Sequence, residues 1–374
     1  MSTATNSTTS APTVVMPTPP VAPIVVPPPP PPPPPAPPVI VVPALPTLPV
    51  LSPAILAMIS KPAASAPVQS YSVQLGSGTL VLSDTHNNAA ITGLNGNFTV
   101  NEAGTGAQIT LGNGNDVINA GYYADVITGS GDQTITLSGS GNSVTVGSTA
   151  GGASDVTKIN FGQGGATVKA GDGNMNVTGA GANNTITLGN GNDNITVTAT
   201  SGSATDNTIQ AGNGNNVVTL SGQHDTVTVG NGNNTINLNT NGSGDTHDVV
   251  NLGLGTNMVF CNSNGATINT GGGHDTVSGG SDNTFALNPS GEALSIWGFT
   301  PGGGDKIDLT QVLKGVSLAH DLSNLGQYIT VGYGTATNTG LTIHGAFGVD
   351  TVHLLGSGNL TLGQIESSFV LPTH

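Results

Sequence analysis

The sequence contains no arginine, a single cysteine and few charged or aromatic side chains. Charged residues make up 7% of the 374 residues, and aromatic residues make up 3%. Because the chain has only five lysines, it lacks the basic surface that neutralises phosphates, and the composition argues against nucleic acid as a partner. Cys261 alone cannot build an intrachain disulfide framework or a thiolate zinc cluster. The formal net charge of −15 instead favours cations as partners.

Proline is almost absent beyond the first part of the chain. Residues 1–70 hold 22 of the 25 prolines, including nine in succession at 27–35. Such a tract adopts polyproline II, and it cannot pack a core because proline lacks the amide proton that helices and sheets need. We therefore predict a disordered proline-rich stalk or linker over residues 1–70. A disordered tail without a role is the alternative.

This proline-rich part shows neither a secretory signal peptide nor a transmembrane segment. Residues 1–10 carry no lysine or arginine, and prolines interrupt the apolar stretch at 39–59. A signal peptide needs a basic start before its apolar run, and a spanning helix needs about 20 apolar residues. We predict no Sec signal peptide and no membrane span.

A large apolar residue recurs about every nine positions beyond residue 70. Of the 22 intervals in the series, 17 are nine residues long, so the register is too regular to arise by chance. The series consists of Val73, Leu82, Ile91, Val100, Ile109, Ile118, Ile127, Ile135, Val144, Ile159, Val168, Val177, Ile186, Ile195, Ile209, Val218, Val227, Ile236, Val250, Val259, Ile268, Val277 and Phe285.

Short strands joined by tight turns explain this period. Segments such as 185–188 (TITL) alternate apolar and polar residues, as a strand with one buried face does. Glycine- and asparagine-rich turns such as 189–193 (GNGND) supply left-handed backbone positions between them. Two strands and two turns make an 18-residue coil, and coils stack about 4.8 Å apart. We predict an all-β protein in which residues 71–285 form a parallel β-roll, or β-solenoid, of about eleven 18-residue coils.

The repeats resemble the RTX family of hemolysin-type calcium-binding nonapeptides, with the motif GGxGxDxUx, where U is a large aliphatic residue. In that family, turn carbonyls and the aspartate two places before U bind Ca²⁺ between coils. The resemblance implies calcium ligands at Asp116, Asp125, Asp193, Asp225, Asp248 and Asp275.

Asparagine replaces the motif aspartate in many repeats. It occupies that position at Asn142, Asn184, Asn207, Asn216, Asn234, Asn257 and Asn283. An amide brings no charge to a calcium site, and stacked asparagines can form a hydrogen-bonded ladder without metal. We predict that calcium binds at the remaining aspartates, above all at Asp225 and Asp248, which should lie in adjacent coils. Folding without calcium stays an open alternative.

Three histidines precede motif aspartates, at His224, His247 and His274. Imidazole beside carboxylate suits a transition metal, but solvated turn residues are the interpretation that we favour. Cys261 alternates with the aliphatic series in the segment 258–261 (MVFC), so we expect a buried and unreactive thiol.

Residues 286–374 leave the nine-residue register. The segment 294–313 (LSIWGFTPGGGDKIDLTQVL) and later stretches resemble the C-terminal target domain of type I secretion substrates. This resemblance implies export through a type I exporter, and hence a secreted protein in the medium or at the cell surface of a Gram-negative bacterium. A mostly-β cap domain that covers the last coil is the second role that we expect, and a cap without an export role is the alternative.

The composition does not favour an enzyme. Most aspartates lie in turns at the repeat period, and the sequence carries no GxSxG, HExxH or P-loop motif. We therefore predict a non-enzymatic extracellular structural or adhesive protein, in a surface layer, a biofilm matrix or a cell-surface rod, which could assemble with itself. The alternative is a binding module that presents its flat threonine- and asparagine-rich face to a glycan or to ice, and a polysaccharide-active enzyme is the third possibility.

Overall fold

The computed structural model describes residues 39–42, 56–58, 71–148, 156–199, 205–239, 247–262, 264–289, 291–316, 322–335, 337–345 and 348–372. All of these belong to one compact unit, Pro37–His374. Most of the predicted stalk therefore lies outside the described residues.

Two long sheets contain nearly all of the secondary structure. The odd-numbered sheet is built from β1 (Val39–Val42), β3 (Tyr71–Leu75), β5 (Ala89–Gly93), β7 (Gln108–Thr110), β9 (Asp125–Thr128), β11 (Ser143–Val146), β13 (Thr167–Ala170), β15 (Thr185–Thr187), β17 (Thr208–Ala211), β19 (Thr226–Val229), β21 (Val249–Asn251), β23 (Thr267–Asn269), β25 (Thr284–Ala286), β27 (Lys306–Asp308) and β31 (Phe369–Val370). The even-numbered sheet is built from β2 (Leu56–Met58), β4 (Gly78–Asp84), β6 (Gly96–Glu102), β8 (Val117–Ala120), β10 (Thr134–Leu137), β12 (Val156–Phe161), β14 (Asn174–Ala180), β16 (Asn194–Thr198), β18 (Val217–Ser221), β20 (Thr235–Asn239), β22 (Met258–Cys261), β24 (His274–Gly279), β26 (Ala293–Trp297), β30 (Gly348–Leu355), β29 (Asn338–Gly345) and β28 (Ile329–Thr335).

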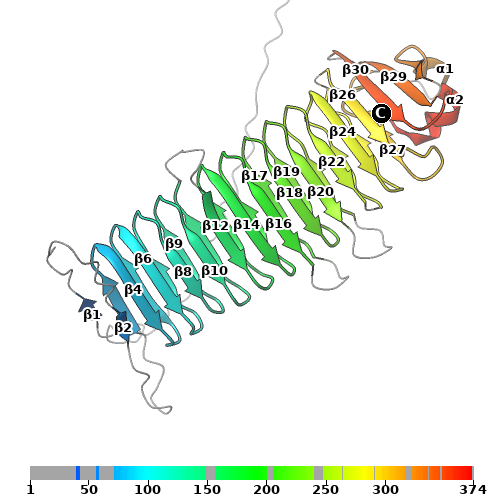
Figure 1. The fold of residues 1–374 in the computed structure, drawn as a ribbon. Helices are drawn as coiled ribbons and strands as arrows, with labels where there is room; N and C mark the ends of the chain where they lie inside the picture. Colours follow the sequence, from blue (N-terminus) through cyan, green and yellow to red (C-terminus); the bar gives the residue numbers. More distant parts are fainter. Residues whose placement is uncertain are drawn as a thin grey trace, which may run out of the picture. The chain divides into compact units, whose positions relative to one another are not determined.

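The chain alternates between the two sheets, so that each strand pairs in parallel with the strands of the preceding and the following coil. Strand β10, for example, pairs with both β8 and β12. The result is a parallel β-solenoid of about 12 turns, which confirms the predicted fold class (Figure 1). The few helices in the described part of the chain are short, namely α1 (Leu322–Leu325), α2 (Leu362–Ile365) and the 3₁₀ turn Glu366–Ser368. None of the helices in the described ranges is long and apolar enough to cross a membrane.

The predicted aliphatic series forms the core between the sheets, with one exception. All of its members are buried except Ile127, which is 41% exposed, while the neighbouring Val126 is fully buried. Val126 stacks on Ile109 and Val144 of the adjacent coils. The prediction for Ile127 was wrong because a nine-residue count cannot distinguish two successive β-branched residues, whereas one residue of slip reverses the face of a strand.

Both sheets continue beyond the two ends predicted for the roll. Strands β1 and β2 come from the predicted stalk and pair with β3 and β4. Beyond residue 285, β27 pairs with β25, and β26 and β30 continue the even-numbered sheet before it turns antiparallel at β29 and β28. These strands cover the last coils of the roll. The division into three domains at residues 70 and 285 stays a prediction.

Close stacking of the turns explains their glycines. Gly214 and Gly232 both have φ near +140°, where other residues are strained. A Cβ atom on Gly214 would collide with the carbonyl oxygen of Gly191, and one on Gly232 would collide with that of Gly214. Only glycine therefore lets the successive turns stack at strand spacing.

Candidate metal sites

The structure places five of the six predicted calcium ligands in the interior, at the start of a strand. Asp116, Asp193 and Asp275 are at the entrances of β8, β16 and β24, and Asp225 and Asp248 are at those of β19 and β21. Each is no more than 3% exposed. Their side chains belong to two rows that run from coil to coil. The even row consists of Asp116, Gln133, Thr157, Met175, Asp193, Asn216, Asn234, Asn257 and Asp275, and the odd row of Ala89, Ala107, Ala124, Asn142, Ala166, Asn184, Asn207, Asp225, Asp248, Ala266, Asn283 and Asp305.

The sixth predicted ligand, Asp125, is not part of either row. It is exposed on the outer face of β9, and Ala124 occupies the row position in its place. The cause is the same one-residue slip that turns Ile127 outward. Asp125 therefore does not fit a calcium site between coils.

Hydrogen bonds join successive members of the even row. The backbone N–H of Asn216 donates to Oδ1 of Asn234 at 3.0 Å, and that of Asn234 donates to Oδ1 of Asn257 at 3.2 Å. The side-chain amides repeat this pattern, because Nδ2 of Asn234 donates to Oδ1 of Asn257 at 2.9 Å and Nδ2 of Asn257 donates to Oδ1 of Asp275 at 2.8 Å. The asparagines thus form the buried ladder that their spacing predicted.

The same amides also donate to the turn carbonyls. Nδ2 of Asn234 lies 3.0 Å from the oxygen of Gly230 and 3.3 Å from that of Gly232, and Nδ2 of Asn257 lies 3.0 Å from that of Gly253. In the RTX resemblance these carbonyls are calcium ligands. Here a neutral N–H₂ group already satisfies them, so the asparagine turns do not fit a calcium ion.

The turns of Asp116 and Asp193 do fit one. Oδ1 of Asp193 accepts from the N–H of Met175 at 2.9 Å, and Oδ1 of Asp116 accepts from that of Phe98 at 2.9 Å. The second oxygen of each carboxylate is buried without a hydrogen-bond partner. Burial raises the pKa of Asp193 to about 6, against the lowering effect of the bond from Met175, and burial likewise raises the pKa of Asp116. An unpartnered, desolvated carboxylate oxygen is a position that a hard cation would satisfy.

Asp225 and Asp248 lie in adjacent coils, as predicted. The N–H of Asp225 donates to Oδ1 of Asp248 at 2.9 Å. Oδ1 of Asp225 accepts from the hydroxyl of Thr205 at 2.7 Å and from the N–H of Asn207 at 2.9 Å. Burial raises the pKa of Asp225 and outweighs these bonds. The pair therefore concentrates negative charge at one edge of the interior.

The sequence prediction missed three buried carboxylates near the end of the roll. Glu292 lies just before β26, and Asp350 lies beside it in the neighbouring strand β30. The N–H of Glu292 donates to Oδ1 of Asp350 at 2.9 Å. The third carboxylate, Asp305, lies just before β27. Burial, and then the charges of Asp275 and Asp350, raise the pKa of Glu292 to about 8. Its Oε2 atom is also buried without a partner. These residues escaped notice because the nine-residue period ends before them.

The histidines lie on the exposed side of the turns. The rings of His224 and His247 have their centroids 5.6 Å apart, and Nδ1 of His224 is 3.8 Å from Oδ1 of Asp206. His224 and Asp206 are exposed, as is His274. Within the described residues, no group of three or more histidine, cysteine or acidic side chains is arranged to hold a metal. Cys261 is buried, as expected.

The comparison with known families agrees with this geometry. A family described as the RTX calcium-binding nonapeptide repeat matches in four copies, at residues 110–143, 201–236 and 267–286. No curated protein and no solved structure matches the chain. The matched segments contain Asp116, Asp225 and Asp275 but neither Asp193 nor Asp248. These repeats are wound into a parallel β-solenoid, so the chain carries an RTX-like β-roll whose matched repeats are of the calcium-binding type.

Proposed function

We propose that the protein is a secreted, non-enzymatic structural or adhesive component of the cell exterior, and that calcium stabilises its β-roll. The observation that carries this proposal is the distribution of the buried carboxylates, which lie singly or in pairs along the two rows at strand entrances. An active site gathers acid, base and binding groups around one substrate position. A ladder of turn residues instead supports an extended stack of coils.

The packing suits a load-bearing element. Each coil buries aliphatic side chains only against its neighbours, so stability accumulates along the axis. Hydrogen-bonded asparagines repeat on the outside of the turns, where the N–H of Asn213 donates to Oδ1 of Asn190 at 3.0 Å and that of Asn231 donates to Oδ1 of Asn213 at 2.9 Å. These exposed ladders tie the coils together without metal.

Calcium would add to this stability at the aspartate positions. Asp116, Asp193, Asp225, Asp248 and Asp275 are the motif carboxylates that we assign to it, and Glu292 adds a further one. An ion that binds only the folded chain raises the free energy of unfolding by mass action. Because asparagine turns intervene, we expect calcium to strengthen a roll that is already β-structured. Far-UV circular dichroism with EGTA and with calcium tests this, and a spectrum that lacks β-structure in EGTA would contradict it.

Residues 286–374 are assigned a type I export role on their resemblance to secretion targets. The test is expression of the full chain in a Gram-negative host with and without a type I exporter. We expect the protein in the medium or on the cell surface only when the exporter is present. Retention in the cytoplasm in both hosts contradicts the assignment.

Electron microscopy of the purified chain in calcium distinguishes a structural component from a soluble binding protein. Lateral or end-on assemblies of the roll support the structural role. Dispersed single particles at all protein concentrations, together with binding to a defined ligand, would argue against it.

A second function, binding through a flat face, is favoured by one observation. Thr167, Thr185, Thr208 and Thr226 follow each other in register on the outer face of the odd-numbered sheet, one per coil. After an interruption at Val249 the column resumes at Thr267 and Thr284.

Regularly spaced hydroxyls and methyls can order water or contact a repeating glycan. Thermal hysteresis measurements and a glycan array test this second function. The structural proposal predicts no activity in either assay, so a positive result would shift the assignment to a binding module.

A further inference from the structure

Two buried carboxylates occupy the first described coils, where the motif row has no acidic residue. Asp84 ends β4 and Glu102 ends β6, and the two residues are direct neighbours across the parallel strands. Asp84 is 2% exposed and Glu102 is 3% exposed. Both alternate with the inward residues Leu82 and Val100, so both side chains face the interior of the roll.

The position at the end of an even strand is apolar in most of the later coils. Leu137, Val197, Leu220, Leu238 and Cys261 occupy it there, and all are buried.

The odd row lies across the turn from that position, and its acidic and apolar residues occur in the reverse order along the roll. It has Ala89 and Ala107 in the first coils but Asp225 and Asp248 later. In the first coils the buried carboxylates therefore stand before the turn, at the end of an even strand, whereas in the later coils they stand after it, at the start of an odd strand.

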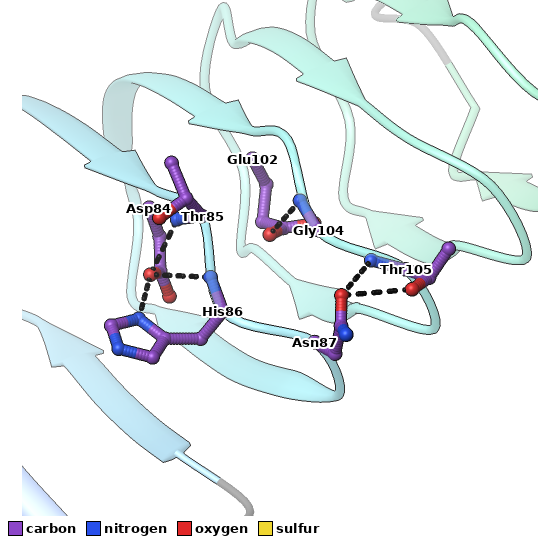
Figure 2. A network of polar contacts seen from close by, with 7 residues as sticks. All are labelled: Asp84, Thr85, His86, Asn87, Glu102, Gly104 and Thr105. Carbon is purple, nitrogen blue, oxygen red and sulfur yellow. Dashed lines mark hydrogen bonds and ion pairs between the residues drawn. The ribbon is translucent and has the colours of Figure 1, made fainter. Parts of the chain in front are cut away.

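One oxygen of each carboxylate is held by the turn, and the other is free. Oδ1 of Asp84 accepts from the N–H of Thr85 at 2.7 Å and from the N–H and ring Nδ1 of His86 (Figure 2). Oε1 of Glu102 accepts from the N–H of Gly104 at 2.7 Å. Oδ2 of Asp84 and Oε2 of Glu102 are buried without a hydrogen-bond partner.

The turn brings further oxygen atoms close to this pair. A Cβ atom on Gly104 would collide with the carbonyl oxygen of His86 and would lie 2.7 Å from Oε1 of Glu102. Because Gly104 has no side chain, the carbonyl oxygen of His86 and a carboxylate oxygen of Glu102 can both lie close to it. Oxygen ligands of these two kinds are the ones that calcium prefers.

The described residues offer little positive charge to balance this pair of carboxylates. Within the described residues, the imidazole of His86 is the one basic group that forms an ion pair with either carboxylate. Burial, and then the negative charge of Asp84, raise the pKa of Glu102, against the effect of the bond from Gly104. A cation would offset the repulsion between these two desolvated carboxylates in adjacent coils.

We propose that Asp84 and Glu102 bind a calcium ion at a site outside the nonapeptide motif, which ties β4 to β6 at the start of the roll. The carboxylates supply the charge, and the His86 carbonyl supplies a neutral oxygen beside them. The imidazole of His86 acts as a positioning group, because its bond to Oδ1 orients the Asp84 carboxylate. The site would hold the first coils together where the ladder of the even row has no asparagine.

The test counts calcium ions bound to the full chain by equilibrium dialysis with elemental analysis. The double variant Asp84→Asn/Glu102→Gln should bind one ion fewer than the natural chain. Asp125→Asn is the matched control, because it removes an exposed carboxylate and should leave the count unchanged. Asp193→Asn should lose the calcium ion that we assign to its own motif site. The experiment therefore distinguishes an absence of binding at Asp84 and Glu102 from an absence of binding at the motif sites. An unchanged count in the double variant overturns the proposal.

Stability gives a second and independent measurement. In EGTA the double variant should melt at the same temperature as the natural chain or higher, since two repelling charges are gone. In saturating calcium the order should reverse, because the natural chain gains a bound ion that the variant lacks. A variant that is less stable by the same amount in both buffers overturns the proposal, as the carboxylates would then serve only their bonds to the turn.

Terbium luminescence places the ion. The N–H of Gly106 donates to the carbonyl oxygen of Tyr122 at 2.8 Å, so a tyrosine lies in the coil that stacks on the Glu102 turn. Terbium replaces calcium and emits when a nearby tyrosine is excited. The tyrosine-sensitised emission should fall in the double variant and persist in Asp193→Asn. Equal emission from the two variants overturns the proposal.

Discussion

Replacement of Asn234 by aspartate should make one rung of the buried ladder depend on calcium. The natural amide nitrogen donates to the oxygens of Gly230, Gly232 and Asn257 at 3.0, 3.3 and 2.9 Å. A carboxylate has no proton to donate, so the oxygens of Gly230 and Gly232 lose this donor and face a negative charge. Oδ1 of Asn257 keeps the bond from the backbone N–H of position 234 but also faces the new charge. Because each unsatisfied buried group costs about 1–3 kcal/mol, we expect a loss of about 3 kcal/mol in EGTA, or roughly 6–12 °C in melting temperature.

Calcium should restore most of this loss. With aspartate at position 234, the turn presents a carboxylate and carbonyls to a cation, as the nonapeptide motif does. Thermal unfolding followed by circular dichroism, in EGTA and in saturating calcium, measures both states. Asn233→Asp is the matched control, because Asn233 is exposed and a carboxylate there can still accept the 3.0 Å bond from the N–H of Thr256. The reasoning would be refuted if Asn234→Asp were as stable as the natural chain in EGTA, or if calcium did not rescue it.

Three other predictions follow from burial and charge. Because the pKa of Glu292 is raised from 4.5 to about 8 in the folded chain, its protonated form should stabilise the fold fully below pH 4.5 in calcium-free buffer, and this stabilisation should be lost as the pH rises through about 8. Glu292→Gln should remove this part of the pH dependence of the melting temperature. Val126→Asp should destabilise the roll by more than about 4 kcal/mol because it buries a charge, while Ile127→Asp should change the free energy of unfolding by only about 0.5 kcal/mol; equal melting temperatures for the two variants would contradict the observed register. The thiol of Cys261 should react with an aromatic disulfide reagent only after denaturation, and rapid reaction of the folded chain would show that this strand is not buried as described.

The local pattern was enough to predict the fold and most of the core. An aliphatic residue every nine positions can be buried continuously only if short strands stack in coils, and the burial of residues such as Ile195 and Val218 confirms this. The neighbouring places of Asp225 and Asp248 followed from the same arithmetic. Spacing could not choose between Val126 and Ile127, because both are β-branched and the choice depends on which one stacks on Ile109.

The sequence by itself determined the period, the asparagine replacements and the strand faces other than that of β9, since these depend only on residues a few positions apart. Only the tertiary structure decided which distant residues share a face. It placed Val217, Met258 and Phe260 on the even-numbered sheet and the column of threonines at Thr167, Thr185, Thr208 and Thr226 on the odd-numbered sheet. It also brought Asp84 and Glu102 together, 18 residues apart and outside the motif, because stacked coils make neighbours of residues one full turn apart.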